Sequence, residues 1–196
     1  ERIITGQTKF STLARMYSMD GAALYGGEMQ PAPSSMYVRP FAEALEKLNF
    51  DKKYFVEGSV IWNGNLYILT WESRVAFIYD AETLEYKSSW KYPREGWGIT
   101  TDGKHLIASD GTANLYFMDE NFAQKKKVLV TIEDRPVRFL NELEYIDGKI
   151  WANVYTADEI VIIDPKDGRV EGVIDCRGLL PKELRTHDTD VLNGIA

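Results

Sequence analysis

Asn63-Gly64-Asn65-Leu66-Tyr67 reads as a tight turn followed at once by a strand. Glycine in the second turn position accepts the positive φ of a two-residue hairpin, so such a pair between alternating apolar segments predicts a β-hairpin. The same signal recurs at Asp20-Gly21, Asp102-Gly103 and Asp147-Gly148. The four turn glycines are 43, 39 and 45 residues apart. The spacing predicts a structural repeat of about forty residues.

A second turn keeps register with the first. Asp80, Asp119 and Asp164 each lie 16 residues after the turn glycine of their own copy, and each opens a turn that its side chain can stabilise. Stretches rich in β-branched and aromatic residues are found in these units, as strands require: Leu66–Trp71, Val75–Tyr79, Leu115–Met118 and Ile160–Ile163. The fixed offset indicates that every copy has the same local structure.

Four short antiparallel strands in each unit of about forty residues predict an all-β fold, a β-propeller. A β-sandwich is the alternative, although its turns need not keep a common period. Four units end near Asp175, and Val191–Ala196 reads as the first strand of a fifth. We therefore expect residues 1–196 to form a single propeller domain that is incomplete at its C-terminal end. Phe41–Leu48, with apolar residues at helical spacing, is the one helix candidate.

Composition excludes several classes of protein. The chain of 196 residues carries 23 Lys and Arg against 30 Asp and Glu, and the resulting net charge of −7 argues against a nucleic-acid partner. Cys176 is the single cysteine and cannot form an internal disulfide. His105 and His187 stand in no metal-ligand spacing, so no metal site is expected. No apolar run reaches the roughly 18 residues of a membrane span.

Equivalent positions of a propeller converge, because the first strand of every blade lines the central channel. Counting back from the turn glycines gives Glu57-Gly58, Gly96-Trp97 and Asn141-Glu142, and counting forward gives Trp71, Asp110 and Tyr155. Register alone predicts a ring of Glu57, Trp97 and Asn141 near the axis. We expect Trp71 and Tyr155 at one common mouth.

Such a pocket suits a small polar ligand with an apolar body, because aromatic walls bury the body and an amide fixes its orientation. A desolvated carboxylate with a raised pKa can act there as general acid or base. The competing interpretation is structural: the tryptophans can pack blades, and Asn141 can tie adjacent strands together. Lys125–Lys127 is expected in a solvated loop, and His105 at the surface.

Several motifs, dense from Tyr54 to Ala196, resemble in their order those of the glutamine cyclotransferases of plant and bacterial type, also called glutaminyl-peptide cyclotransferases. The motifs are Tyr54-Phe55-Val56-Glu57-Gly58, Leu69-Thr70-Trp71, Glu95-Gly96-Trp97-Gly98-Ile99-Thr100-Thr101-Asp102-Gly103-Lys104, Ser109-Asp110-Gly111, Leu140-Asn141-Glu142-Leu143-Glu144-Tyr145, Trp151-Ala152-Asn153-Val154 and Asp190-Val191-Leu192-Asn193-Gly194-Ile195-Ala196.

The resemblance implies a five-bladed β-propeller, here with the last blade largely missing. It also implies an acyltransferase that converts the N-terminal glutamine of peptides or proteins to pyroglutamate and releases ammonia. The resemblance implies no metal or other cofactor. It does imply a secreted or periplasmic location.

The same resemblance assigns roles to residues. Glu57 matches the family's proton shuttle, and the substrate-binding positions match Phe10, Phe55, Trp71, Trp97, Asn141 and Tyr155. The chain departs from the family pattern at three places: Thr12 replaces a glutamine, Val56 a glycine and Tyr155 a tryptophan. The Gly-Lys-Leu-Trp segment of the family's last blade is absent.

These departures favour an alternative function, a catalytically weak or inactive propeller that acts as a binding module or as a subunit of an assembly. A sugar-binding propeller lectin would also use aromatic walls. That third function does not explain Glu57 and Asn141 in their family context.

Overall fold

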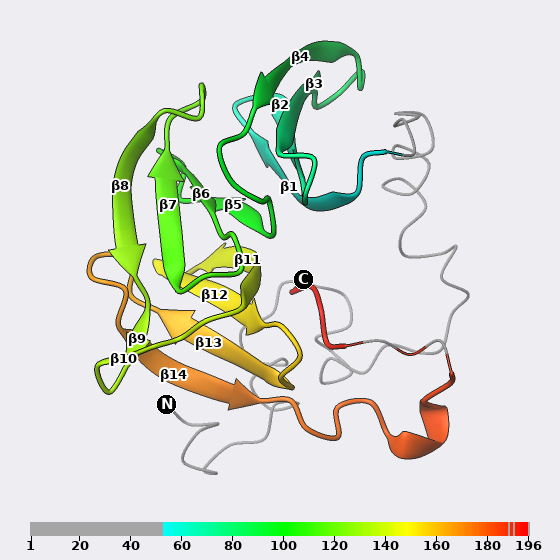
Figure 1. Ribbon diagram of the computed structural model, residues 1–196, viewed down its shortest axis with the longest axis vertical. Helices are drawn as coiled ribbons and strands as arrows, with labels where there is room; N and C mark the ends of the chain where they lie inside the picture. Colours follow the sequence, from blue (N-terminus) through cyan, green and yellow to red (C-terminus); the bar gives the residue numbers. More distant parts are fainter. Residues whose placement is uncertain (1–52, 188, 190, 196) are drawn as a thin grey trace. The chain divides into compact units, whose positions relative to one another are not determined.

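Three four-stranded antiparallel sheets follow one another along the chain in the computed structural model, which describes residues 53–187, 189 and 191–195 (Figure 1). These residues lie within one compact unit, Phe50–Ala196. In each sheet the spatial order of the strands is their order in sequence. The all-β fold built from four-stranded repeats is thus confirmed for the described residues. The Asp20-Gly21 turn and the helix candidate Phe41–Leu48 lie outside them.

The strand bounds show how regular the repeat is. The first sheet comprises β1 (Val56–Trp62), β2 (Asn65–Thr70), β3 (Val75–Asp80) and β4 (Tyr86–Lys91). The second comprises β5 (Ile99–Thr101), β6 (Leu106–Ala108), β7 (Asn114–Met118) and β8 (Gln124–Leu129). The third comprises β11 (Leu140–Ile146), β12 (Lys149–Val154), β13 (Glu159–Ile163) and β14 (Val170–Asp175). The last of the three sheets ends at Asp175, where the sequence predicts the end of its fourth unit; the first predicted unit lies outside the described residues.

Each described turn glycine joins the first and second strands of its own sheet. Asn63-Gly64 and Asp147-Gly148 form two-residue turns, with φ of 49° and 71° in the first and 49° and 79° in the second. Asp102-Gly103 lies in a longer loop, because Thr101 pairs with Leu106 across four loop residues. The prediction of equivalent hairpins is therefore confirmed for these three copies.

The second landmark also has one structure in all three sheets. Asp80, Asp119 and Asp164 end or follow the third strand, and each accepts backbone N–H groups from the turn that it opens. Each carboxylate also pairs with a lysine at 2.7–2.8 Å: Lys87, Lys125 and Lys149 respectively. These aspartates are turn-formers, as the sequence indicated.

The first strands of the three sheets converge (Figure 1). Glycine makes the approach possible: a Cβ on Gly58 would lie 2.9 Å from the backbone nitrogen of Ile99, and one on Gly98 only 2.1 Å from the carbonyl oxygen of Asn141. The Ser109 hydroxyl joins the last two strands, because it accepts from Gly98 N–H and donates to Asn141 C=O, both at 2.8 Å. Inner strands β1, β5 and β11 are thus held backbone against backbone.

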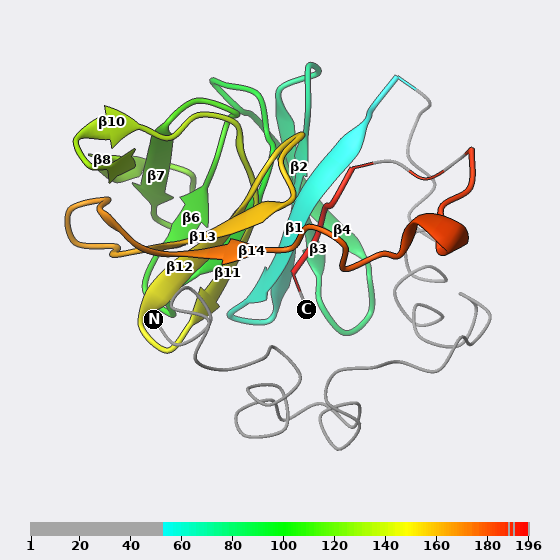
Figure 2. The same ribbon diagram turned by 90° about the horizontal axis from the view of Figure 1, so that it is seen from below.

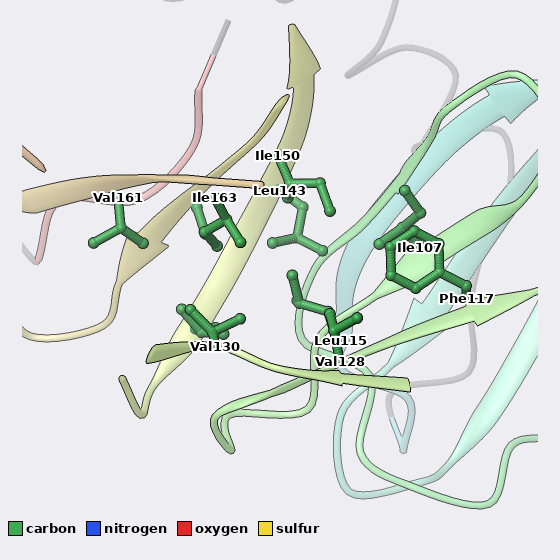
Figure 3. Close-up of a cluster of buried hydrophobic side chains, with 11 residues drawn as sticks. Ile107, Leu115, Phe117, Val128, Val130, Leu143, Ile150, Val161 and Ile163 are labelled. Atoms are coloured by element: carbon green, nitrogen blue, oxygen red, sulfur yellow. The ribbon is translucent and has the colours of Figure 1, made fainter. Parts of the chain in front are cut away.

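Apolar side chains fill the space between neighbouring sheets. Between the second and third sheets, side chains from both sides point toward one another (Figure 3): Ile107, Leu115, Phe117, Val128 and Val130 face Leu143, Ile150, Val161 and Ile163. A second cluster lies between the first and second sheets and includes Tyr67, Leu69, Ile78, Ile99, Leu106 and Met118. Burial of these faces fixes the stacking of the sheets.

Three features differ from the sequence expectation. Lys125–Lys127 lies in β8 and not in a loop: β8 is the outer strand of its sheet, so its lysines stay exposed, and Val128 is its buried residue. Thr131–Ile132 (β9) and Arg135–Pro136 (β10) form an additional small hairpin. Val191–Ile195 is not in a strand; it runs back to β11 (Figures 1 and 2), where a side-chain hydrogen bond and not a backbone ladder holds Asn193.

We predict that Gly98→Ala lowers the free energy of unfolding by about 3 kcal/mol, because the new methyl group overlaps the rigid Asn141 carbonyl. Gly64→Ala is the control: its Cβ meets open space, so only the left-handed φ costs, about 1 kcal/mol. Urea denaturation of both variants measures the difference. Equal destabilisation would show that the inner strands are not held at this contact.

Candidate functional site

Aromatic side chains from all three sheets form one row. Trp71 follows β2 and Tyr155 follows β12 at the same place, since each donates its backbone N–H to the residue before the first strand of its sheet, Phe55 and Phe139, at 3.0 and 2.8 Å. The Phe55 and Trp71 rings lie edge to face with centroids 6.1 Å apart, and those of Trp97 and Tyr155 lie 5.5 Å apart. Such edge-to-face contacts fix the orientation of the rings.

Glu95 joins the two halves of this row. Its Oε2 accepts a hydrogen bond from Trp71 Nε1 at 3.0 Å and another from Trp97 Nε1 at 3.2 Å. Arg74 lies 3.9 Å from the other carboxylate oxygen. The aromatic row, which we define as Phe55, Trp71, Trp97 and Tyr155, therefore continues without a break from the first sheet to the third.

The Trp97 ring packs directly against Gly111. A Cβ on Gly111, which has a φ of 74°, would lie 2.5 Å from the Trp97 ring. Asp110, the neighbour that counting from the turn made equivalent to Trp71, is used in a local turn, because its carboxylate accepts from the N–H and hydroxyl of Thr112. The longer β5–β6 loop shifts the count by two residues, so Asp110 is not part of the aromatic row.

Glu57 and Asn141 occupy the same position in their sheets, at a β-bulge of the first strand. In β1 the pairing passes from Val56 with Thr70 to Ser59 with Ile68, so Glu57 and Gly58 together oppose one residue. In β11 it passes from Leu140 with Val154 to Leu143 with Ala152, so Asn141 and Glu142 together oppose Asn153. Bulges often re-aim side chains next to active sites.

Burial sets the chemistry of the two bulge residues. Partial burial raises the pKa of the Glu57 carboxyl above its ordinary value. Asn141 is only 4% exposed, and its Nδ2 donates to Asn193 Oδ1 at 3.0 Å. The carboxamide is thereby held in one orientation beside the inner strands.

Glu142 is the most perturbed carboxyl of the site. Burial, with the charges of Glu144 and Glu57 as smaller causes, raises its pKa to about 7. Its Oε1 is buried and has no hydrogen-bond partner in the part of the chain that the structure describes. The site therefore contains two carboxyls, Glu57 and Glu142, that both resist ionisation.

A family model described as glutamine cyclotransferase matches residues 5–196. The chain belongs to the glutamine cyclotransferase family. It is 43% identical over 160 residues to the glutaminyl-peptide cyclotransferase of Arabidopsis thaliana, a match that covers 79% of this chain and 49% of the relative. The structure is similar to that of Myxococcus xanthus glutaminyl cyclase, with a TM-score of 0.62 and 35% identity over 64% of this chain and 55% of that one. The chain thus spans about half the length of these relatives.

A shorter match is of another kind. Over 53 residues the chain is 45% identical to the chaperone SurA of Shewanella sp. (strain MR-4), which covers 26% of this chain and 12% of SurA. A match to so small a part of SurA assigns no function to this chain.

The sequence expectations for this family member can now be placed. The structure brings Phe55, Trp71, Trp97 and Tyr155 into one row and puts Glu57 and Asn141 at equivalent bulges; their roles in substrate binding and proton transfer stay predictions. Phe10 and Thr12 lie outside the described residues. Glu95 was missed because no repeat position marks it; the signal available was that partly buried indole N–H groups need an acceptor.

Surface hollows occur elsewhere on the described chain. Open hollows lie away from the aromatic row, one of about 570 Å³ between Asp158, Gly178, Leu180, Lys182 and Arg185. Among residues 53–187, 189 and 191–195, no three His, Cys, Asp or Glu side chains are grouped as metal ligands. No helix in the described part of the chain is long and apolar enough to cross a membrane.

We predict that Glu95→Ala loosens the aromatic row, because both indole N–H groups lose their acceptor, and lowers the free energy of unfolding by about 1 kcal/mol. Acrylamide quenching of tryptophan fluorescence should increase. Glu72→Ala, which removes an exposed carboxylate beside Trp71 in sequence, is the control and should leave quenching unchanged. Unchanged quenching in Glu95→Ala would mean that the rings are held by packing alone.

Proposed function

We propose that the protein carrying this chain is a glutaminyl-peptide cyclotransferase, an acyltransferase that converts the N-terminal glutamine of a peptide or protein to pyroglutamate and releases ammonia. The observation that carries the proposal is the pair of equivalent bulges that present Glu57 and Asn141 beside the aromatic row. Family membership and the relative from Arabidopsis support the reaction class.

The reaction joins two groups of one residue. The α-amine nitrogen of the substrate attacks the carbonyl carbon of its own side-chain amide, a new C–N bond closes the five-membered ring, and the C–N bond to the amide nitrogen breaks. One proton leaves the attacking nitrogen and one must reach the departing nitrogen, so that ammonia is released. Since both reactants belong to one residue, the protein's task is to hold a folded conformer and to move the proton.

Glu57 is the group that moves this proton in our proposal. Its carboxylate accepts a proton from the attacking amine and donates it to the leaving nitrogen. The raised pKa of the half-buried Glu57 carboxyl brings its two protonation states closer in free energy at neutral pH, as a shuttle requires. No nucleophilic side chain is needed.

The aromatic row and Asn141 orient the substrate. The rings offer flat apolar surface for the substrate's side chain and backbone, and Phe55, Trp71 and Tyr155 are exposed, so that a bound substrate can cover them. Asn141 offers a fixed carboxamide that can bond the polar end of the substrate. Tyr155 stands where the family has tryptophan; its edge-to-face contact with Trp97 keeps the row continuous.

The remaining proposals concern the whole protein. We infer a five-bladed propeller, of which three four-stranded sheets are described here, with peptides or proteins that begin with glutamine as partners. A secreted or periplasmic location and a role as subunit of a larger assembly belong to the same proposal.

We predict that Glu57→Gln lowers kcat by about 10²–10⁴-fold, because the amide keeps the shape of the side chain and removes the titrating group. An ammonia-release assay with a glutaminyl dipeptide measures this. Glu82→Gln, in the exposed turn after β3, is the control and should keep the wild-type rate.

Two outcomes would contradict the function. If the wild-type protein releases no ammonia from glutaminyl peptides, the inactive binding module is the better description. If Glu57→Gln is as active as wild type, another acid carries the proton.

A further inference from the structure

Three buried polar atoms near the site have no hydrogen-bond partner in the described part of the chain: Glu142 Oε1, Asn153 Oδ1 and Asn153 Nδ2. Asn153 is only 1% exposed, so bulk water does not solvate its carboxamide. Buried polar groups are normally paired, because an unpaired one keeps its full desolvation penalty. An orphaned acid and an orphaned amide in one place need an explanation.

The bulge of β11 puts both side chains on one face of the third sheet. Leu143 and Ala152 are paired and point into the core between the second and third sheets. Neighbouring residues in a strand point to opposite faces, so Glu142 and Asn153 both point to the other face. The register leaves them directly opposite each other, beside Asn141.

Only one protonation state of Glu142 matches Asn153. A carboxamide offers one acceptor and an NH₂ donor, and a neutral carboxyl offers one O–H donor and one acceptor. The structure has no hydrogen bond between them, and in our inference the neutral Glu142 carboxyl turns toward Asn153 so that the two groups satisfy each other's orphaned atoms. An ionised carboxylate has no proton to donate and would leave Asn153 Oδ1 unpaired.

The charges around Glu142 favour the same state. The groups whose charges act on it are Glu57 on β1 and Glu144 on β11, and both are acids that oppose a further negative charge. Burial raises the pKa of both carboxyls, and Glu142, the more buried of the two, has a pKa of about 7.

We propose that Glu142 is a positioning residue for Glu57: paired with Asn153, it keeps one proton inside the site, so that Glu57 is the one of the two bulge carboxyls that meets the substrate ionised. This inference rests on the proposed cyclotransferase function for its consequence in turnover, and on the geometry of the free protein for the pair itself.

The consequence for turnover has a definite sign. When Glu142 ionises, its negative charge makes Glu57 hold a proton more tightly. Delivery of that proton to the departing nitrogen then becomes slower. Turnover at saturating peptide should therefore fall as the pH rises through the ionisation of Glu142.

The first test needs no activity. Carboxyl ¹³C NMR titrations of wild type, Glu142→Gln, Glu57→Gln and Glu144→Gln, with Glu82→Gln in the exposed turn after β3 as control, measure each group directly. We expect a carboxyl that titrates near pH 7 in wild type and Glu82→Gln, is absent in Glu142→Gln, and titrates at lower pH in both Glu144→Gln and Glu57→Gln, where a negative neighbour is gone. A Glu142 that titrates in the range of ordinary glutamates, or that ignores Glu57→Gln, overturns the proposal.

The second test uses the pH dependence of kcat. Wild type and the exposed control Glu82→Gln should lose turnover above about pH 7, and Glu142→Gln should lack this fall because its amide cannot ionise. Asn153→Leu, which removes the partner carboxamide, should shift the fall to a different pH in an otherwise folded protein. If Glu142→Gln keeps the wild-type profile, the proposal is wrong even though the protein cyclises glutamine. If neither the wild type nor any variant releases ammonia, the cyclotransferase function is wrong. The NMR titration alone then tests whether Glu142 pairs with Asn153.

Discussion

The close backbone approach of the first strands is the constraint on which the rest of the structure depends. Gly98 lies so close to the Asn141 carbonyl that no side chain fits between them, and Gly58 also lies close to the backbone of Gly98 and Ile99. Ser109 joins these strands through two hydrogen bonds. Because the strands meet here, the residues beside the contact, Glu57 and Asn141, converge from different sheets. The apolar clusters between the sheets stabilise the stacking, but the glycines decide how near the strands come.

Two buried polar side chains beside this contact have a cost in stability. Glu142 and Asn153 are buried with unpaired polar atoms, and the pKa of Glu142 is raised because burial penalises its charged form. A core built only for stability would place apolar residues at these positions. In the first strands of the other two sheets, the position that corresponds to Glu142, counted back from the turn glycine, holds an uncharged residue: Gly58 in one and Trp97 in the other. The orphaned pair in the third sheet is therefore a local exception, for which we propose proton handling as the reason.

The repeat made much of the fold predictable. Two-residue turns and aspartate turns are local structures, so Asn63-Gly64, Asp147-Gly148 and Asp164 could be placed from spacing alone. Counting back from the glycines found Glu57 and Asn141 because their bulges recur at the same count. Counting forward failed at Asp110, because the β5–β6 loop is longer and only the paired strands reveal this. Glu95, with its two indole contacts, is a tertiary arrangement that no periodicity encodes.

A crystal structure of the Glu57→Gln variant with a glutaminyl dipeptide bound tests the central claim most directly, since this variant should hold its substrate without turning it over. The account predicts the substrate's α-nitrogen within about 3 Å of the side chain at position 57, its glutamine side chain against Trp97, and its polar end at Asn141. A dipeptide bound instead in the open hollow beside Asp158 and Lys182, with position 57 empty of contacts, would contradict it.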